Sequence, residues 1–126
     1  MKPSSVTRNR RSKLDKALKY FLNPNEVSRR ELAPGITLRI MWGENIMMSM
    51  VEIAPNAVLP THSHSNEQSG VVLQGEFEFT IGDETKTMRQ GDAYLIPGDV
   101  PHSLVGSDGW ALCVDIFSPP REDYKT

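Results

Sequence analysis

The sequence predicts an all-β fold, built as a barrel or sandwich of short antiparallel strands. From about residue 27 onward, runs rich in β-branched and aromatic residues are separated by Gly, Pro, Asn and Asp roughly every ten residues, which is typical of such folds. Within EFEFTI, apolar Phe77, Phe79 and Ile81 alternate with polar residues, and Gly82-Asp83 then precedes ETKTMR. This pattern predicts a half-buried hairpin with a tight turn.

The same pattern places the strands approximately. A chain of 126 residues fits one domain with its own core, and we place this domain at residues 27–126. Since no segment after residue 27 has helical periodicity, we expect an antiparallel meander throughout. The expected strands lie near residues 29–33, 36–42, 46–54, 70–74, 76–81, 84–89, 93–96, 102–105 and 110–117.

Residues 1–26 are predicted to form a basic N-terminal arm. Residues 1–30 carry nine Lys or Arg against two acids, whereas residues 31–126 carry five against fourteen. A short run of this kind is usually a solvated tail, so we do not expect the arm to bind nucleic acid. Apolar residues at helical spacing within it predict a short amphipathic helix, with Ser12 as N-cap and Asn23-Pro24 as its stop. These apolar residues are Leu14, Leu18, Phe21 and Leu22.

Composition narrows the class of protein. The sequence contains neither a signal peptide nor an apolar run of about 18–20 residues, which a membrane span requires, so we expect a cytoplasmic protein that does not enter a membrane. Cys113 is the single cysteine, so no internal disulfide is possible. Its neighbours in WALCVDIF indicate a strand, where we expect it to be a packing residue rather than a catalytic thiol.

One predicted strand is apolar on both faces. Ile46 through Ile53 includes Met47, Met48 and Met50, so neither alternating face is polar. A second subunit would cover the outer face, and we therefore expect a homodimer. A monomer in which the N-terminal helix covers that face would have the same pattern.

The three histidines fall in two short segments, PTHSHSNEQSGVVLQG and GDAYLIPGDVPH. On a strand, His62 and His64 point to the same face, where two imidazoles can bind one ion, although such a pair can also simply face solvent. Gln68 can add its amide oxygen from the next strand, with Glu67 then facing away. His102 can join only if a barrel brings distant strands together.

These four side chains predict one divalent metal ion. Three imidazoles and a neutral oxygen suit zinc, nickel, iron, manganese or cobalt better than calcium or magnesium, which prefer oxygen ligands throughout. The sequence does not choose among the five metals.

The two histidine segments resemble the paired motifs of the cupin family, G-x5-H-x-H-x3,4-E-x6-G and G-x5-P-x-G-x2-H-x3-N. In the first motif His62, His64 and Gly75 agree, Gln68 stands at the acidic position, and Pro55-Asn56 replaces the leading Gly. In the second motif the agreeing residues are Gly91, Pro97 and His102, while Asp99 and Gly106 replace Gly and Asn. The resemblance implies a cupin double-stranded β-helix, or jelly-roll barrel, preceded by the short arm or helix.

A narrower resemblance covers about residues 43–124. HSHSNEQ, LQGEFEFTIG, GDAYLIPGDVPH and DIFSPPREDY are similar to the KdgF family of pectin-degradation proteins, which carries Gln at the fourth ligand position. That family linearises 4,5-unsaturated galacturonate to an open-chain keto sugar acid. The resemblance implies a sugar-acid substrate, with Asp115 as an acid or base, Phe117 lining the mouth and Arg121 holding a carboxylate.

The residues themselves are compatible with this chemistry. Asp115 lies in the apolar run ALCVDIF, where a carboxylate is costly unless it faces a polar cavity or accepts a structural hydrogen bond. Alternation places Ala111, Cys113, Asp115 and Phe117 on one face. Arg121 can pair bidentately with a uronate or remain a solvated tail residue. Trp42 and Trp110 can stack on a sugar, but core positions are commoner for aromatic residues in strands.

We therefore expect an enzyme in which the metal polarises an enol ether or hemiacetal and Asp115 moves a proton while water adds. The neutral Gln68 leaves the ion its full double charge and so strengthens it as a Lewis acid. The alternatives are a metal-dependent dioxygenase, which an iron site with open positions also permits, and a non-catalytic module that binds small molecules.

Overall fold

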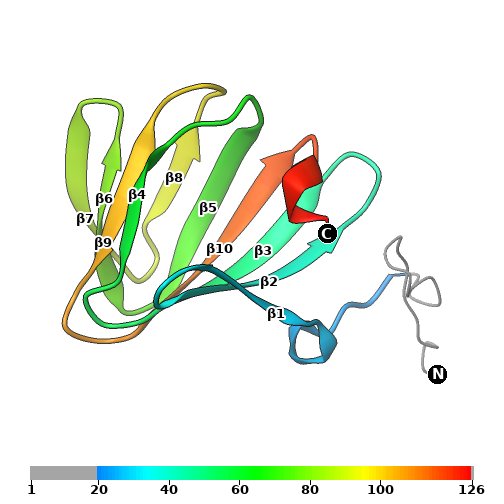
Figure 1. Ribbon diagram of the computed structural model, residues 1–126, viewed down its shortest axis with the longest axis horizontal. Helices are drawn as coiled ribbons and strands as arrows, with labels where there is room; N and C mark the ends of the chain where they lie inside the picture. Colours follow the sequence, from blue (N-terminus) through cyan, green and yellow to red (C-terminus); the bar gives the residue numbers. More distant parts are fainter. Residues whose placement is uncertain (1–19, 126) are drawn as a thin grey trace.

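The computed structural model describes residues 20–125 as two antiparallel sheets that face each other (Figure 1). The six-stranded sheet has the order β1-β2-β3-β10-β5-β8, and the four-stranded sheet has the order β4-β9-β6-β7. This is the predicted jelly-roll barrel. The elements are η2 (Pro24–Glu26), β1 (Arg29–Ala33), β2 (Ile36–Trp42), β3 (Met47–Ile53), β4 (Val58–His62), β5 (Glu67–Gln74), β6 (Glu76–Ile81), β7 (Glu84–Arg89), β8 (Ala93–Ile96), β9 (His102–Gly106), β10 (Ala111–Ser118) and η3 (Glu122–Tyr124).

The expected meander is wrong, although the pairing is antiparallel throughout the described strands. β10 lies between β3 and β5, and β9 lies between β4 and β6, so both late strands enter between earlier ones. Pairing between residues so far apart depends on burying the inward faces of both sheets, and no local turn signal encodes it. The inserted strands bring the ends of the chain's two histidine segments together.

Three elements differ from the sequence prediction. β4 was not expected as a separate strand, because its sequence VLPTH contains Pro60. The strand lies at the edge of its sheet and has a bulge between Leu59 and His62, which is where a sheet tolerates proline. β5 begins at Glu67, three residues before the expected 70–74, and the short 3-10 helix η3 was not expected.

The predicted N-terminal helix lies mainly outside the described residues. Its last part, residues 20–22, is described and is not helical. Asn23 instead caps η2, because its side chain accepts a hydrogen bond from the Asn25 backbone N–H at 3.0 Å. Asn25 in turn accepts a hydrogen bond from Arg39 on β2, which fixes this segment beside the barrel.

The predicted hairpin is confirmed in detail. β6 and β7 pair in register on either side of Gly82-Asp83, with Phe77 opposite Met88. Phe77 and Phe79 are buried, whereas Glu78 between them is exposed. The alternation therefore places the aromatic side chains in the core and the acid in solvent.

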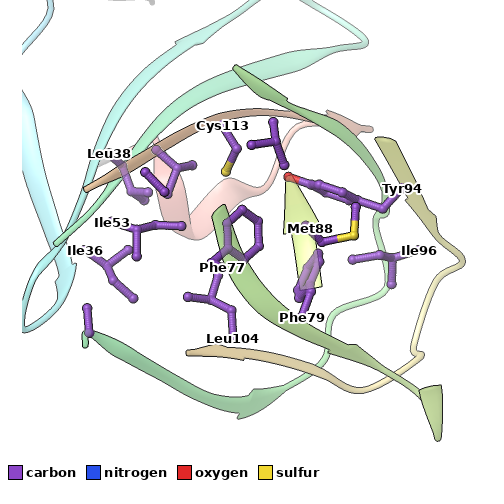
Figure 2. Close-up of a cluster of buried hydrophobic side chains, with 14 of the residues drawn as sticks. Ile36, Leu38, Ile53, Phe77, Phe79, Met88, Tyr94, Ile96, Leu104 and Cys113 are labelled. Carbon is purple, nitrogen blue, oxygen red and sulfur yellow. The ribbon is translucent and has the colours of Figure 1, made fainter. Parts of the chain in front are cut away.

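The core fills the space between the sheets, and it is most completely apolar at the end of the barrel formed by the start of β2 and β10. Ile36, Ile53 and Phe77 are at most 1% exposed there. Figure 2 shows Phe77 and Leu104 from one sheet meeting Ile53 and Cys113 from the other. Cys113 is buried within this cluster, and burial raises the pKa of its thiol well above the usual value, as expected for a packing residue.

The outer face of β3 is less covered than its inner face. Met47, Ser49, Val51 and Ile53 face inward and are buried, while the alternate residues are partly exposed. The homodimer that would cover the outer face stays a prediction. Among residues 20–125 the structure has no helix with the length and apolarity that a membrane crossing needs.

Candidate functional site

The three histidines converge at one end of the barrel. His62 ends β4 and His102 begins β9, and these residues are paired in register. His64 follows in the loop after β4, so it does not share a strand face with His62 as the sequence predicted. One nitrogen of each ring lies within 4.8 Å of the others, so the three form a cluster that could hold one metal ion after a small inward shift.

Backbone carbonyls orient all three rings. Each imidazole Nδ1 lies 2.9–3.1 Å from the carbonyl oxygen of a residue two positions away. Nδ1 must carry the proton to donate there, which leaves the Nε2 lone pair free to bind a metal. Nε2 of His102 is buried without a hydrogen-bond partner among the described residues, as expected for a ligand atom.

Burial favours the uncharged form of two of the imidazoles. It lowers the pKa of His102 to about 4, and it also lowers the pKa of His64, on which the nearby Arg121 acts in the same direction. Both rings are therefore neutral at pH 7, the form that binds metal ions.

Gln68 joins this cluster from β5. Its side chain is buried, and its Oε1 lies 3.0 Å from Nε2 of His64, while neighbouring Glu67 points into solvent. Gln68 also hydrogen-bonds to Asp115, and an amide can do so only by donating from Nε2. Asp115 thereby fixes which way the amide points, and its oxygen faces the histidines.

Four turn positions that frame these residues have the left-handed backbone that favours glycine. They are Asn56, Gly75, Gly91 and Asp99, with φ values of 62°, 73°, 90° and 69°. Asn56 and Asp99 are where the sequence lacks the glycines of the cupin motifs. Because Asn and Asp tolerate this conformation better than other side chains, the turns survive both replacements.

A row of inward-facing residues crosses the large sheet beside the histidines. In register, Ser49 of β3 is opposite Asp115 of β10, Asp115 is opposite Gly70 of β5, and Gly70 is opposite Tyr94 of β8. A Cβ atom at Gly70 would collide with the Tyr94 ring and hydroxyl. Glycine therefore lets Tyr94 pass over β5 and donate to Oδ1 of Asp115 at 2.5 Å.

Asp115 is a carboxylate with an unusual proton affinity. Burial raises its pKa to about 6, against the hydrogen bonds from Tyr94 and Gln68 and the charge of Arg121, all of which lower it. A group with this pKa gains and loses a proton near neutral pH. The row therefore places a candidate acid or base beside Gln68.

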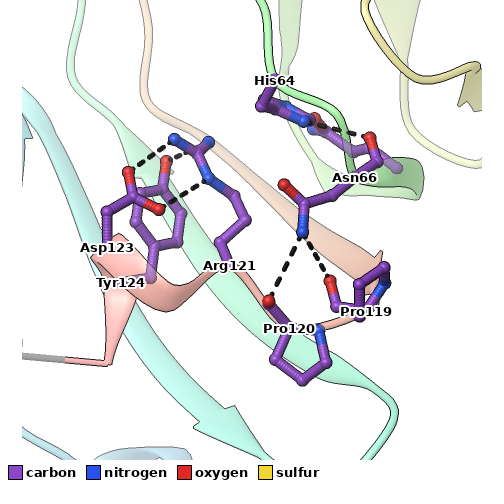
Figure 3. Close-up of polar contacts among 8 residues, drawn as sticks. His64, Asn66, Pro119, Pro120, Arg121, Asp123 and Tyr124 are labelled. Carbon is purple, nitrogen blue, oxygen red and sulfur yellow. Dashed lines mark hydrogen bonds and ion pairs between the residues drawn. The ribbon is translucent and has the colours of Figure 1, made fainter.

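The C-terminal segment brings Arg121 to the same cavity. The guanidinium lies 4.0 Å from the centre of the Tyr124 ring, and it donates to the carboxylate of Asp123 and to the hydroxyl of Tyr124 (Figure 3). Its side chain is 12% exposed, so it is not the solvated tail residue that the sequence allowed. Phe117 lies beneath it and contacts the His64 ring edge to face.

Asn66 fastens this segment to the histidine loop. Its side-chain amide donates to the carbonyl of Pro119 at 2.8 Å and lies 3.4 Å from that of Pro120. The backbone carbonyl of Asn66 hydrogen-bonds with Nδ1 of His64 (Figure 3). One residue thus couples the orientation of a candidate ligand to the position of Arg121.

The side chains line a small, partly open cavity of about 30 Å³. The donor set of three imidazoles and an amide oxygen fits a divalent transition metal. Residues that line the cavity include His62, Gln68, His102, Asp115, Phe117 and Arg121. The candidate metal ligands His62, His64, Gln68 and His102 therefore lie at one end of the barrel together with Asp115, Phe117 and Arg121.

Sequence reasoning missed the residues that support this set. Tyr94, Gly70 and Asn66 act through their positions in the folded barrel, and alternation along β8 was the one available signal, because it turns Tyr94 inward. The expectation of a core position is wrong for Trp110, which is 64% exposed and precedes β10 at the opposite end of the barrel.

Comparison with known proteins agrees with this geometry. The model of the family described as Cupin domain matches residues 49–117, which span the histidines, Gln68 and Asp115. The chain belongs to the cupin family. Among curated cupins, the pectin degradation protein KdgF of Dickeya dadantii (strain 3937) is 32% identical over 108 residues, which cover 84% of this chain and 97% of that protein.

Two further relatives show the range of the similarity. The structure of KdgF from Halomonas sp. superposes with a TM-score of 0.78 at 30% identity, covering 85% of this chain and 99% of that one. H2HPP isomerase of Bacillus subtilis is 30% identical over 104 residues, which cover 81% of this chain but 43% of that protein. Both named curated relatives are similar along most of the barrel.

Proposed function

We propose that this protein is a metal-dependent cupin enzyme that linearises an unsaturated sugar acid, of which 4,5-unsaturated galacturonate is the example. The observation that carries the proposal is Asp115, a carboxyl group with a pKa of about 6 that hydrogen-bonds to Gln68 beside three convergent histidines. The similarity to KdgF supports the substrate class.

His62, His64, His102 and Gln68 would hold the ion, which when bound supplies a Lewis acid for substrate oxygens. Opening such a ring is an isomerisation in which the C1–O5 bond breaks, the anomeric hydroxyl loses its proton, and C4 gains one as the enol becomes a ketone. No redox partner is needed, and the proton transfers are the part that protein groups must perform.

Asp115 performs these transfers in the proposal. Tyr94 holds Oδ1 by its hydrogen bond, and Gln68 approaches from the side of the histidines, so the carboxylate cannot rotate away from the cavity. The pKa of about 6 gives both protonation states appreciable populations near pH 7. A general acid or base of this kind typically contributes 10²–10⁴-fold to a rate, roughly.

Arg121 binds the uronate carboxylate in the proposal. Asp123 occupies part of its guanidinium in the structure, but a planar fork has five donors, and a substrate carboxylate can pair with those that face the cavity. Phe117 supports the guanidinium from below and forms the wall of the mouth.

The test is turnover by Asp115→Asn. The substrate is prepared with a pectin lyase, and ring opening is followed by loss of the absorbance of the conjugated enol ether. We expect wild-type turnover and at least a hundredfold loss in Asp115→Asn, with the metal content of the purified protein unchanged. Full activity in the variant would contradict the role of Asp115.

The same preparation separates the alternatives. A dioxygenase consumes oxygen in proportion to product, whereas an isomerisation proceeds at the same rate under nitrogen. A non-catalytic binding module gives no product with any bound metal. Zinc or nickel loading is informative, because an oxygenase needs a redox-active metal and a Lewis acid does not.

The homodimer and the cytoplasmic location remain part of the proposal. On the outer face, Met48 and Met50 of β3 stand opposite Ile116 and Val114 of β10, and all four are partly buried. A second copy would bury this face without polar cost. Sedimentation velocity should give a dimer for the wild type and a monomer for Val114→Lys.

A further inference from the structure

Ser49 lies on the cavity wall and has no role in the site described so far. It sits in the middle of β3, faces inward and is 1% exposed. Its Oγ has no hydrogen-bond partner among the described residues, although the residue lines the same cavity as Gln68 and Asp115. A buried hydroxyl left in this way costs folding free energy compared with the methyl group of alanine.

The position of Ser49 in the sheet defines what it can reach. Ser49 and Asp115 are direct cross-strand partners on the inner face, and such pairs have Cβ atoms about 5 Å apart. Tyr94 approaches Asp115 from the opposite side, over Gly70. The Asp115 carboxylate thus has the Tyr94 hydroxyl, which donates to it, on one side, and the Ser49 hydroxyl on the other.

We propose that Ser49 is a substrate-binding residue, whose Oγ hydrogen-bonds to a hydroxyl or ring oxygen of the sugar acid while Asp115 acts on the neighbouring atom. A serine hydroxyl can donate to an ether oxygen and accept from a hydroxyl, so it suits the alternating oxygens of a sugar ring. The inference rests on the proposed function, since it assigns a contact to that same substrate.

The neighbouring side chains favour a polar ligand atom at this place. The cavity wall also carries apolar side chains such as Leu38, Val51 and Phe77, which offer no hydrogen bond. A substrate oxygen that enters between Ser49 and Asp115 therefore finds two partners there. An apolar substrate group at the same place would leave the Ser49 hydroxyl without a partner, which would give the site selectivity for a polar group.

The experiment compares two serine-to-alanine variants of the full, metal-loaded chain. Ser49→Ala removes the hydroxyl from the cavity. The matched control is Ser107→Ala, which lies after β9, outside the cavity, and removes an Oγ that accepts from the Gly109 backbone N–H at 3.3 Å. Each variant is measured for kcat and KM with 4,5-unsaturated galacturonate, for affinity toward saturated galacturonate by calorimetric titration, and for Tm.

We expect opposite results from the two variants. Ser49→Ala should lower kcat/KM and the galacturonate affinity by about three- to tenfold, the value of one neutral hydrogen bond, while its Tm equals or exceeds that of the wild type. Ser107→Ala should keep both kinetic constants and have an equal or slightly lower Tm.

Three outcomes overturn the proposal in different ways. Unchanged kcat/KM and affinity in Ser49→Ala reject the contact and leave the proposed function standing. A Tm loss in Ser49→Ala greater than in Ser107→Ala shows that the hydroxyl has a structural role. Failure of the wild type itself to turn over the unsaturated substrate rejects the proposed function, and the contact with it.

Discussion

The two ends of the barrel interior are built from the same strands but have opposite chemistry. At one end the inward side chains of the large sheet are apolar, as with Ile36, Ile53 and Ala111, and they pack on Phe77 from the other sheet. Four residues further along β10 and β3, the inward positions are Asp115 and Ser49.

This difference separates stability from function within one core. The apolar end gains free energy from burial, because close-packed hydrocarbon is removed from water there. The polar end loses free energy, because it buries the Asp115 carboxyl group, the His64 and His102 rings and a Ser49 hydroxyl that has no hydrogen-bond partner within residues 20–125. Such groups are costly inside a barrel unless they bind something, so we infer that the polar end is the functional end.

The largest effect on stability should come from the apolar end. Phe77→Ala should lower the free energy of unfolding by about 3–5 kcal/mol, because it removes a fully buried ring and leaves a cavity between the sheets. Urea denaturation followed by circular dichroism measures this. A loss below about 1 kcal/mol would mean that the apolar end does not carry the fold.

At the polar end, replacing the Asp115 carboxyl group should raise the free energy of unfolding instead of lowering it. The Asp115 pKa is about 6 in the folded protein and near 3.8 when unfolded, so its ionisation costs stability as pH rises between these values. Asp115→Asn avoids this cost. Compared with the metal-free wild type, the variant should gain about 2–3 kcal/mol between pH 4 and pH 7.

The measurement is urea unfolding of both proteins at the two pH values in the presence of a chelator. The comparison with wild type cancels the titration of the histidines, whose lowered pKa values act with the opposite sign. A constant difference between the two proteins from pH 4 to pH 7 would contradict the buried ionisation of Asp115.

A smaller effect should follow from removing the phenol that reaches over Gly70. Tyr94→Phe deletes the hydrogen bond to Asp115, which should cost about 1.5 kcal/mol at pH 7 and raise the Asp115 pKa further. In an Asp115→Asn background the same substitution should cost less. A double-mutant cycle measures the coupling, and additive losses would show that the contact does not stabilise the carboxylate.

The sequence predicted much of this molecule because its signals were local. Alternation and turn residues gave the β6–β7 hairpin, and the His-x-His segment with His102 gave the histidine cluster. The jelly-roll barrel itself was predicted from the resemblance to cupins, because no local sequence pattern indicates how the strands close into a barrel. β4 was missed because Pro60 is a poor strand residue except at a sheet edge, and edge position is a property of the whole fold.

What could not be predicted depends on register between distant strands. The passage of Tyr94 over Gly70 to Asp115 needs three strands aligned to the residue, and these lie up to 45 positions apart in the chain. The orientation of Gln68 depends on the same alignment, because Asp115 fixes its amide. The sequence identified candidate residues such as Asp115 individually. The residues that position them, such as Tyr94 and Gly70, could be identified only from the strand register in the folded sheet.

We infer that His62, His64, His102 and Gln68 hold one metal ion. The number of metal ions bound per chain is the direct test of this. The chelator-treated protein is dialysed against zinc, nickel, iron, manganese or cobalt, and bound metal is measured by mass spectrometry beside the variant with all three histidines changed to alanine. We expect one ion per chain in the wild type for at least one of these metals, and none in the triple-alanine variant. A wild type that retains no ion, or a variant that binds as tightly, would contradict it.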